Sequence, residues 1–220
     1  MDLYDNGLTH RWNQWVRNTF ILPKMRRRLE NKDVTILCNN CNGGFISHDL
    51  GLRFNSPTVN LYFKEGGFFN FCEDLDYYLA APLVPMPEGK DGDKIYPVFT
   101  LGEGARKIEL HFLHYHSYEE AREKWEARKK RINKNNLFVV SAFFDASSRD
   151  LVERFERLPQ KNKVIFSEKE YPDAPHVFYI HGFPKGLQVL SLFHGLCGHR
   201  KMDQFDFIHW FNTGEFKRNY

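Results

Sequence analysis

Apolar residues follow two kinds of pattern along this chain. Short continuous runs of apolar and β-branched residues are typical of buried strands, and they cover residues 34–37, 137–143, 163–166 and 176–180. Runs in which polar and apolar residues alternate also predict strands, at 58–63 and 107–113. Apolar residues at helical spacing predict helices, at 8–22, 46–52, 68–79, 118–132 and 151–158.

Strands that alternate with helices favour a parallel sheet covered by helices. We therefore predict a single α/β domain over residues 1–220, built as a three-layer, mostly parallel sheet with helices on both faces. Pro23 is expected to end or kink the first helix. The Pro- and Gly-rich segment 82–97 is predicted to be a long irregular loop, and 182–220 to be less regular, with a short helix near its end.

Composition narrows the classes of function. The 220 residues are 42% hydrophobic and 27% charged, and 31 basic against 28 acidic residues give a net charge of +3, too even to favour nucleic-acid binding. A signal peptide is not apparent, and no apolar run approaches the ~20 residues that span a bilayer. Four cysteines indicate reduced thiols, so we predict a cytoplasmic protein. The basic run 24–28 is either a solvated helix face or a patch for phosphate or acidic headgroups.

Three polar turns follow predicted strands and carry the candidate chemistry. Cys41 follows the strand 34–37, His114 and His116 follow 107–113, and Asp145 follows 137–143. In a parallel sheet these turns share the edge at which ligands bind. A thiol, an imidazole and a carboxylate suit nucleophilic catalysis, because the histidine takes the thiol proton and the carboxylate orients the imidazole. The alternative is that Cys41 is a small turn residue and the histidines only cap strand and helix ends.

Other interpretations of the same turn remain open. His48 and Asp49 are local alternatives as base and orienting group. Cys38 and Cys41 form a C-x-x-C, which suggests dithiol redox chemistry. A zinc site is also chemically possible; its thiolate and imidazole ligands would be Cys38, Cys41, His194, Cys197 and His199.

A further set of residues is assigned to substrate or anion binding. Gly43-Gly44 at a helix start favours contact with phosphate or carboxylate, but no fuller nucleotide motif accompanies it, so the sequence implies no cofactor. Arg128 falls in the apolar stripe beside Trp125 and must either extend to solvent or meet an anion. The full set is Asn39, Asn40, Gly43, Gly44, His48, Asp49, His116, Lys124, Trp125 and Arg128.

The segments 39–46 (NNCNGGFI), 49–52 (DLGL), 55–57 (NSP) and 108–115 (IELHFLHY) resemble a bacterial family of unknown function. Its members are often labelled exopolysaccharide biosynthesis proteins, and the resemblance covers roughly residues 25–170. It implies a place in cell-surface polysaccharide metabolism, with Cys41 at the family's Cys position. The family often has Trp after this Cys, where this chain has Asn42, which implies a different contact with the substrate.

These observations predict an enzyme that modifies a surface-polysaccharide precursor, through acyl transfer with a Cys41 nucleophile and a His114 base. Its partner would be a saccharide or an activated sugar or acyl donor. One alternative is a non-catalytic protein that binds a sugar nucleotide or an anionic glycan; another is a thiol oxidoreductase that uses Cys38 and Cys41. The sequence does not set the oligomeric state.

Overall fold

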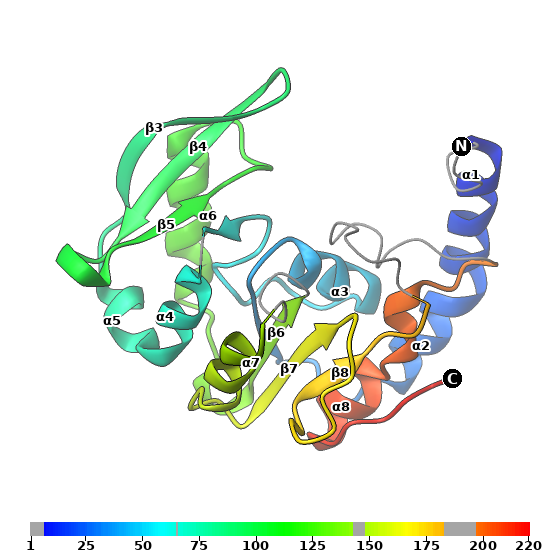
Figure 1. Ribbon diagram of the computed structural model, residues 1–220. Coiled ribbons are helices and arrows are strands. Elements are labelled where there is room, and N and C mark those ends of the chain that lie inside the picture. The colour runs from blue at the N-terminus through cyan, green and yellow to red at the C-terminus, as the bar shows by residue number, and fades with distance from the viewer. Residues whose placement is uncertain (1–6, 65, 143–147, 183–196) are drawn as a thin grey trace.

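Two four-stranded sheets organise the residues that the computed structural model describes, which are 7–64, 66–142, 148–182 and 197–220 (Figure 1). One sheet is parallel, with the order β1 (Thr35–Cys38), β6 (Leu137–Ala142), β7 (Asn162–Ser167) and β8 (Val177–Tyr179). The other is antiparallel, with the order β2 (Tyr62–Phe63), β5 (Ile108–His111), β4 (Lys94–Leu101) and β3 (Val84–Asp91).

Helices cover both faces of the parallel sheet. The α-helices of the described residues are α1 (Gly7–Val16), α2 (Leu22–Arg28), α3 (Asn42–Leu50), α4 (Gly67–Glu73), α5 (Leu75–Ala80), α6 (Tyr118–Lys129), α7 (Arg149–Glu156) and α8 (Phe207–Thr213). Successive strand residues point to opposite faces. Ile36 therefore joins an apolar cluster with α3 and α8, whereas Leu37 joins one with α4, α6 and α7. Burial on both faces explains why these strands are continuously apolar.

The prediction of an α/β fold is confirmed, but the prediction of one mostly parallel sheet is wrong. The predicted strands 58–63 and 107–113 contribute β2 and β5 to the separate antiparallel sheet. The alternation of residues 107–113 reflects this placement, since one face of β5 packs on the core while Glu109 and His111 lie on the other. Such one-sided burial is typical of antiparallel sheets.

The prediction of an irregular loop at 82–97 is also wrong. These residues form β3 and the start of β4, paired from Val84 to Asp91. Pro85 and Pro87 are tolerated because β3 is an edge strand, where a missing N–H breaks no ladder bond. The register shifts between Met86 and Gly89, where the ring of Tyr96 lies so close to the backbone that a Cβ at residue 89 would overlap it.

The N-terminal helix does not end at Pro23. Residues Arg17–Ile21 form one π-helical segment between α1 and α2, and the chain stays helical to Arg28. Pro23 has no N–H to donate, and the wider turn just before it absorbs the break in the hydrogen-bond ladder.

Other predicted boundaries agree more closely. Gly51 ends α3 in a left-handed conformation, and Ser117 caps α6 through the amide of Glu120. The predicted helix 68–79 is broken at Asp74, whose carboxylate caps α5. The terminal helix is present as α8, and 183–196 lie outside the described residues. Among the described helices, none combines the length and apolar character needed to cross a bilayer.

Candidate functional site between the two sheets

The turn that follows β1 lies where the two sheets meet. The amide of Phe63 in β2 donates to the carbonyl of Asn39, at 3.2 Å. This bond joins an edge of the antiparallel sheet to the carboxyl end of β1, the position at which α/β folds commonly bind ligands. We call the residues 39–44 the Cys41 turn, and the polar groups around it on β2, β4 and β5 the inter-sheet site.

The Cys41 turn is fixed mainly by its own short contacts. The side-chain oxygen of Asn40 accepts from the amide of Asn42 at 2.9 Å, and the carbonyl of Cys41 accepts from the amides of Gly44 and Phe45. Three amide groups of the first helical turn are therefore already used. The predicted anion site at Gly43-Gly44 is weakened, because most of these donors face a partner within the turn.

Gly43 and Gly44 have a packing role instead. A Cβ at residue 43 would lie 2.7 Å from the Cβ of Cys38, and one at residue 44 would lie 2.7 Å from Oδ1 of Asn60. Only a residue without a side chain lets α3 approach β1 and the following loop this closely. The Gly-Gly pair thus sets the position of the turn relative to Cys38 in β1 and to Asn60 in the loop before β2.

Two asparagine side chains in this turn have unused hydrogen-bonding atoms. Asn42 is 1% exposed, and within the described part of the chain neither Oδ1 nor Nδ2 of its amide meets a partner. Nδ2 of Asn40 is likewise buried without one. A buried amide without partners costs on the order of 1–3 kcal/mol. Such atoms mark either a water site or a ligand site.

Cys41 is a protonated thiol at neutral pH. Burial raises its pKa to about 11, although the positive charge of Lys94 opposes the shift. A helix N-terminus generally lowers the pKa of a thiol, but desolvation outweighs that effect here. The thiol therefore needs a proton acceptor before it can act as a nucleophile.

His114 lies near the same lysine but does not share the edge that the sequence predicted. It follows β5, which belongs to the antiparallel sheet, so the shared parallel edge of Cys41 and His114 is absent. The side chain is exposed, yet desolvation and the charge of Lys94 lower the pKa of its imidazole. His114 is thus neutral near pH 7. Asp145, the third predicted member, lies outside the described residues.

A chain of hydrogen bonds on the outer face of the antiparallel sheet supplies a second set of titratable groups. Oε1 of Glu109 is 2.7 Å from Nε2 of His111, Nδ1 of His111 is 3.4 Å from the hydroxyl of Tyr96, and that hydroxyl is 3.2 Å from the hydroxyl of Tyr62. The rings of Tyr62 and His111 also stack, with centroids 4.4 Å apart. A carboxylate, an imidazole and two phenols in series can move a proton.

The electrostatic surroundings of this hydrogen-bonded series favour neutral His111 and neutral Tyr62. Desolvation lowers the pKa of His111, the hydrogen bond and charge of Glu109 raise it, and Lys64 lowers it further, with a net lowering. Desolvation and the bond to Tyr96 raise the pKa of Tyr62. A neutral imidazole whose Nε2–H faces Glu109 leaves Nδ1 free to accept from Tyr96.

The sequence analysis missed these four residues. One signal in the sequence could have identified two of them. Glu109 and His111 are two residues apart in the predicted strand 107–113, which places both side chains on its polar face. Tyr96 lay in the segment that was predicted to be a loop, and Tyr62 entered only as part of a strand. Only the pairing of β5 with both β2 and β4 brings them together.

The three residues of α6 that were assigned to substrate or anion binding do not form one surface. Lys124 is exposed, Trp125 is fully buried in the core, and Arg128 is 8% exposed. The guanidinium of Arg128 is buried, and its hydrogen-bond partners among the described residues are uncharged. It donates to the carbonyl of Val59 at 3.2 Å and to the hydroxyl of Tyr115. The hydroxyl of Tyr115 donates to the same carbonyl at 2.8 Å, so Arg128 and Tyr115 together hold the loop that precedes β2.

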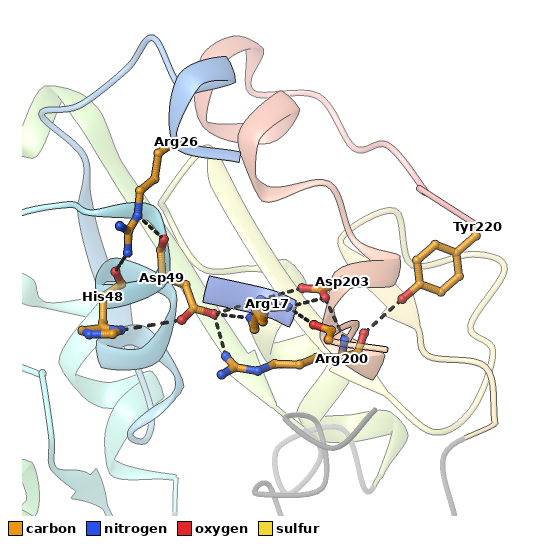
Figure 2. Close-up of polar contacts among 8 residues, drawn as sticks. Arg17, Arg26, His48, Asp49, Arg200, Asp203 and Tyr220 are labelled. Carbon is orange, nitrogen blue, oxygen red and sulfur yellow. Dashed lines mark hydrogen bonds and ion pairs between the residues drawn. The ribbon is translucent and has the colours of Figure 1, made fainter. Parts of the chain in front are cut away.

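His48 and Asp49 lie at the opposite end of α3 from Cys41, roughly 10 Å along the helix. Figure 2 shows that Asp49 belongs to a buried cluster of charges. Asp49 accepts from Arg17 at 2.8 Å and from Arg200 at 2.6 Å, and Arg17 also donates to Asp203 at 2.7 Å. We call these four residues the Arg17 cluster. His48 is exposed, with Nδ1 3.6 Å from Asp49, so neither residue is positioned as a partner for Cys41.

The remaining predicted residues have local roles. Asn39 contributes the carbonyl that binds β2. The amide of His116 donates to the carboxylate of Glu120 at 3.0 Å, and its ring is exposed. Cys38 and Cys41 are both in the reduced form, and Cys38 is fully buried. Among the described residues, no three His, Cys, Asp or Glu side chains converge to hold a metal ion; His194, one of the possible zinc ligands, lies outside them.

Two comparisons with known proteins bear on this site. The profile of a family described as "Domain of unknown function (DUF1919)" matches residues 13–212, which include every residue of the inter-sheet site. A protein of Haemophilus influenzae, described as "Uncharacterized protein", is 41% identical over 195 residues, which are 88% of this chain and 91% of the relative. Neither description names an activity.

Proposed function

The chain belongs to the DUF1919 family, which is described without an activity, and we propose that it is an enzyme of cell-surface polysaccharide biosynthesis. In this proposal the inter-sheet site transfers a group to a hydroxyl of a saccharide. The observation that carries the proposal is the hydrogen-bonded chain of Glu109, His111 and Tyr96, in the sheet whose edge strand β2 bonds to Asn39 of the Cys41 turn. The polysaccharide context comes from the resemblance of the segments 39–46 and 108–115.

The hydrogen-bonded series Glu109, His111 and Tyr96 supplies the proton transfer that such a reaction needs. A saccharide hydroxyl bound beside Tyr96 gives its proton to the phenol oxygen as the phenol gives its own to Nδ1 of His111. Glu109, at 2.7 Å from Nε2, then stabilises the imidazolium that forms. The hydroxyl oxygen attacks the group that the donor carries, and the leaving group of the donor departs with the electrons of the broken bond. General-base assistance of this kind typically accelerates a reaction about 10²–10⁴-fold.

The Cys41 turn supplies the part of the site that holds the saccharide. The unpartnered amide of Asn42 offers one acceptor and two donor hydrogens, and Asn40 offers a further donor. Sugar hydroxyls both donate and accept, so these groups match them in number and type. The stacked rings of Tyr62 and His111 provide an apolar surface of the kind on which sugar rings pack.

Acyl transfer through Cys41 is a second candidate, favoured by the placement of Lys94 near both Cys41 and His114. The sulfur would attack the acyl carbon of an activated donor and expel the donor's leaving group, while the thiol proton passes to the neutral imidazole of His114 and from there to the leaving group. The acceptor hydroxyl would then attack the thioester and give its proton to the imidazole, and the Cys41 sulfur would leave and take that proton back. The raised pKa of Cys41 makes this step dependent on that proton acceptor.

The deciding experiment is a deletion of the gene in the source organism, followed by analysis of the sugars and acyl groups of its surface polysaccharide. We expect the deletion to remove one sugar or substituent, which the wild-type gene restores. His111→Asn and Tyr96→Phe should fail to restore it, whereas the matched control His116→Asn, in an exposed ring, should restore it fully. An unchanged polysaccharide after deletion, or full restoration by His111→Asn, contradicts the proposal.

The same complementation separates the two candidates. If Cys41 is the nucleophile, Cys41→Ser fails as completely as His111→Asn, because a serine hydroxyl is far less nucleophilic than a thiol. If the Cys41 turn only binds the saccharide, Cys41→Ser retains most of the activity. Alkylation of Cys41 with a mapped label, which requires no known substrate, provides an independent measure of its reactivity.

Proton NMR titration of the imidazoles tests the relay without any substrate. Glu109→Gln removes the charge that raises the pKa of His111 and should lower that pKa further, whereas Lys64→Met removes an opposing charge and should raise it. The pKa of His114, which burial and Lys94 lower, serves as the internal control and should stay the same in both variants. Shifts of the same sign in both variants contradict the electrostatic role assigned to Glu109.

A further inference from the structure

Three large hydrophobic side chains are exposed together on the N-terminal helix. Trp12 is 60% exposed, Trp15 is 49% exposed and Phe20 is 60% exposed. Their rings are in contact, with centroids 5.1 Å apart for the two tryptophans and 5.6 Å apart for Trp15 and Phe20. We call these three residues the aromatic strip. A continuous exposed aromatic surface of this kind is typical of an interaction site.

The π-helical segment Arg17–Ile21 creates the strip. In an α-helix, residues five apart lie about 140° from each other around the axis, so Trp15 and Phe20 would not touch. A π-helix closes its hydrogen bonds from i to i+5, which brings such residues to the same side. The same segment turns Arg17 inward, where it binds Asp49 and Asp203. One backbone feature thus anchors the helix and aligns the aromatic rings.

The charge around the strip has one sign. Between Gly7 and Arg28 the chain has six basic residues and no acidic residue. Arg17, Arg26 and Arg28 bind acceptors in the body of the protein, as Figure 2 shows for the first two. The other three are exposed and lie at helical spacing from the strip: Arg11 is four residues before Trp15, and Lys24 and Arg27 are four and seven residues after Phe20.

We propose that the aromatic strip and its basic flanks dock this protein on the surface of a bilayer that contains anionic lipids. Trp and Phe enter the boundary between headgroups and acyl chains, while Lys and Arg attract anionic headgroups. In Figure 1, α1 stands at one end of the molecule, away from the antiparallel sheet, so that docking leaves the inter-sheet site open. The absence of acidic residues between 7 and 28 favours an anionic surface. This proposal does not rest on the proposed function.

The test is co-sedimentation of the full chain with vesicles of phosphatidylcholine, alone or with about one-third phosphatidylglycerol. We expect binding to the mixed vesicles only, and a loss of affinity in added salt. The triple variant W12A/W15A/F20A should bind at least about tenfold more weakly. Lys24→Gln and Arg27→Gln should each weaken binding about fivefold, whereas the matched controls Lys107→Gln and Lys161→Gln, at exposed lysines elsewhere, should leave it unchanged.

Tryptophan fluorescence gives a second measurement that a general loss of structure would not imitate. Trp12 and Trp15 are exposed, whereas Trp125 and Trp210 are fully buried, so a blue shift on adding mixed vesicles reports on the strip. Unfolding by urea should be unchanged in the triple variant, because its side chains are exposed. Three results would overturn the proposal. The first is equal binding to both kinds of vesicle, and the second is binding that survives in the triple variant. The third is no vesicle binding together with a dimer that the triple variant dissociates.

Discussion

The two ends of α3 are fixed in opposite ways. At its N-terminal end, Gly43 and Gly44 bring the backbone against β1 and Asn60, and the adjoining amides of Asn40 and Asn42 keep atoms without partners. At its C-terminal end, Asp49 lies in the Arg17 cluster, where two guanidinium groups face two carboxylates at 2.6–2.8 Å.

The difference lies in how completely the polar groups are paired. In the Arg17 cluster every charge has an opposite charge beside it, and the hydrogen bonds join α3, the N-terminal helix and the segment 200–203. Burial lowers the pKa of Arg17, but its bonds to Asp203 and Asp49 outweigh this and raise it. The same four side chains also line a small pocket, but their charges are already paired with one another. The N-terminal end leaves hydrogen-bonding capacity unused beside the titratable groups of the inter-sheet site.

Removing Arg17 should have the largest effect on stability. Arg17→Ala leaves Asp49 and Asp203 buried with one cation fewer, which typically costs about 3–5 kcal/mol. Urea unfolding measures this loss. The matched control is Arg149→Ala, whose partners Glu153 and Asp173 lie at the surface, and it should leave the midpoint almost unchanged. Equal midpoints for the two variants would mean that the Arg17 cluster is not a structural anchor.

The N-terminal end of α3 should be sensitive to bulk instead of charge. Gly43→Ala places a methyl group 2.7 Å from the Cβ of Cys38, so that α3 must shift away from β1. Overpacking of this kind costs about 1–3 kcal/mol. Gly7→Ala is the matched control, since a Cβ there has no atom within 4 Å, and it should cost nothing. A neutral Gly43→Ala would show that the close approach is not required.

The sequence predicts one sheet of this fold well and the other poorly, for a physical reason. β1, β6 and β7 are buried on both faces, so each gives a continuous apolar run that can be recognised without knowing its neighbouring strands. β3 is an exposed edge strand that contains prolines, and its pairing with β4 depends on register and not on burial. Its residues therefore resemble a loop until the partner strand is known.

The candidate site divides in the same way. The Cys41 turn is a local feature, and its position after a buried strand made it visible. Tyr96 and His111 meet only through the pairing of β4 with β5, and Arg17 and Asp203 meet across 186 residues of sequence. Contacts of such separation depend on the whole fold. The prediction that Cys41 and His114 share one parallel edge is wrong for this reason, since β5 belongs to the antiparallel sheet.

The reactivity of Cys41 tests whether its environment disfavours charge. With a pKa near 11, Cys41 should be alkylated slowly at neutral pH and faster as the pH rises, while the exposed Cys197 is labelled first and serves as the internal control. Because the folded-state pKa lies above the ordinary 9.0, the protonated thiol is favoured in the folded protein. Stability should therefore fall as pH rises from about 9 to about 11, and Cys41→Ser should abolish that part of the dependence. Labelling of Cys41 as fast as Cys197 at neutral pH contradicts this.

Asn42 offers the sharpest contrast with the Arg17 cluster, because the expected loss of stability is the smallest. Asn42→Leu replaces a buried amide without partners by an apolar group of similar size, which is neutral or slightly stabilising, within about 1 kcal/mol. Asn31→Leu is the matched control, since that amide bonds to Asn136 and to the carbonyl of Phe211, and it should cost about 1–3 kcal/mol. If Asn42→Leu also fails to restore the surface polysaccharide in the deletion strain, the amide is held for a ligand and not for folding. A loss of stability equal to that of Asn31→Leu would show that Asn42 has a structural partner, such as a bound water, and would remove the contrast between the two ends of α3.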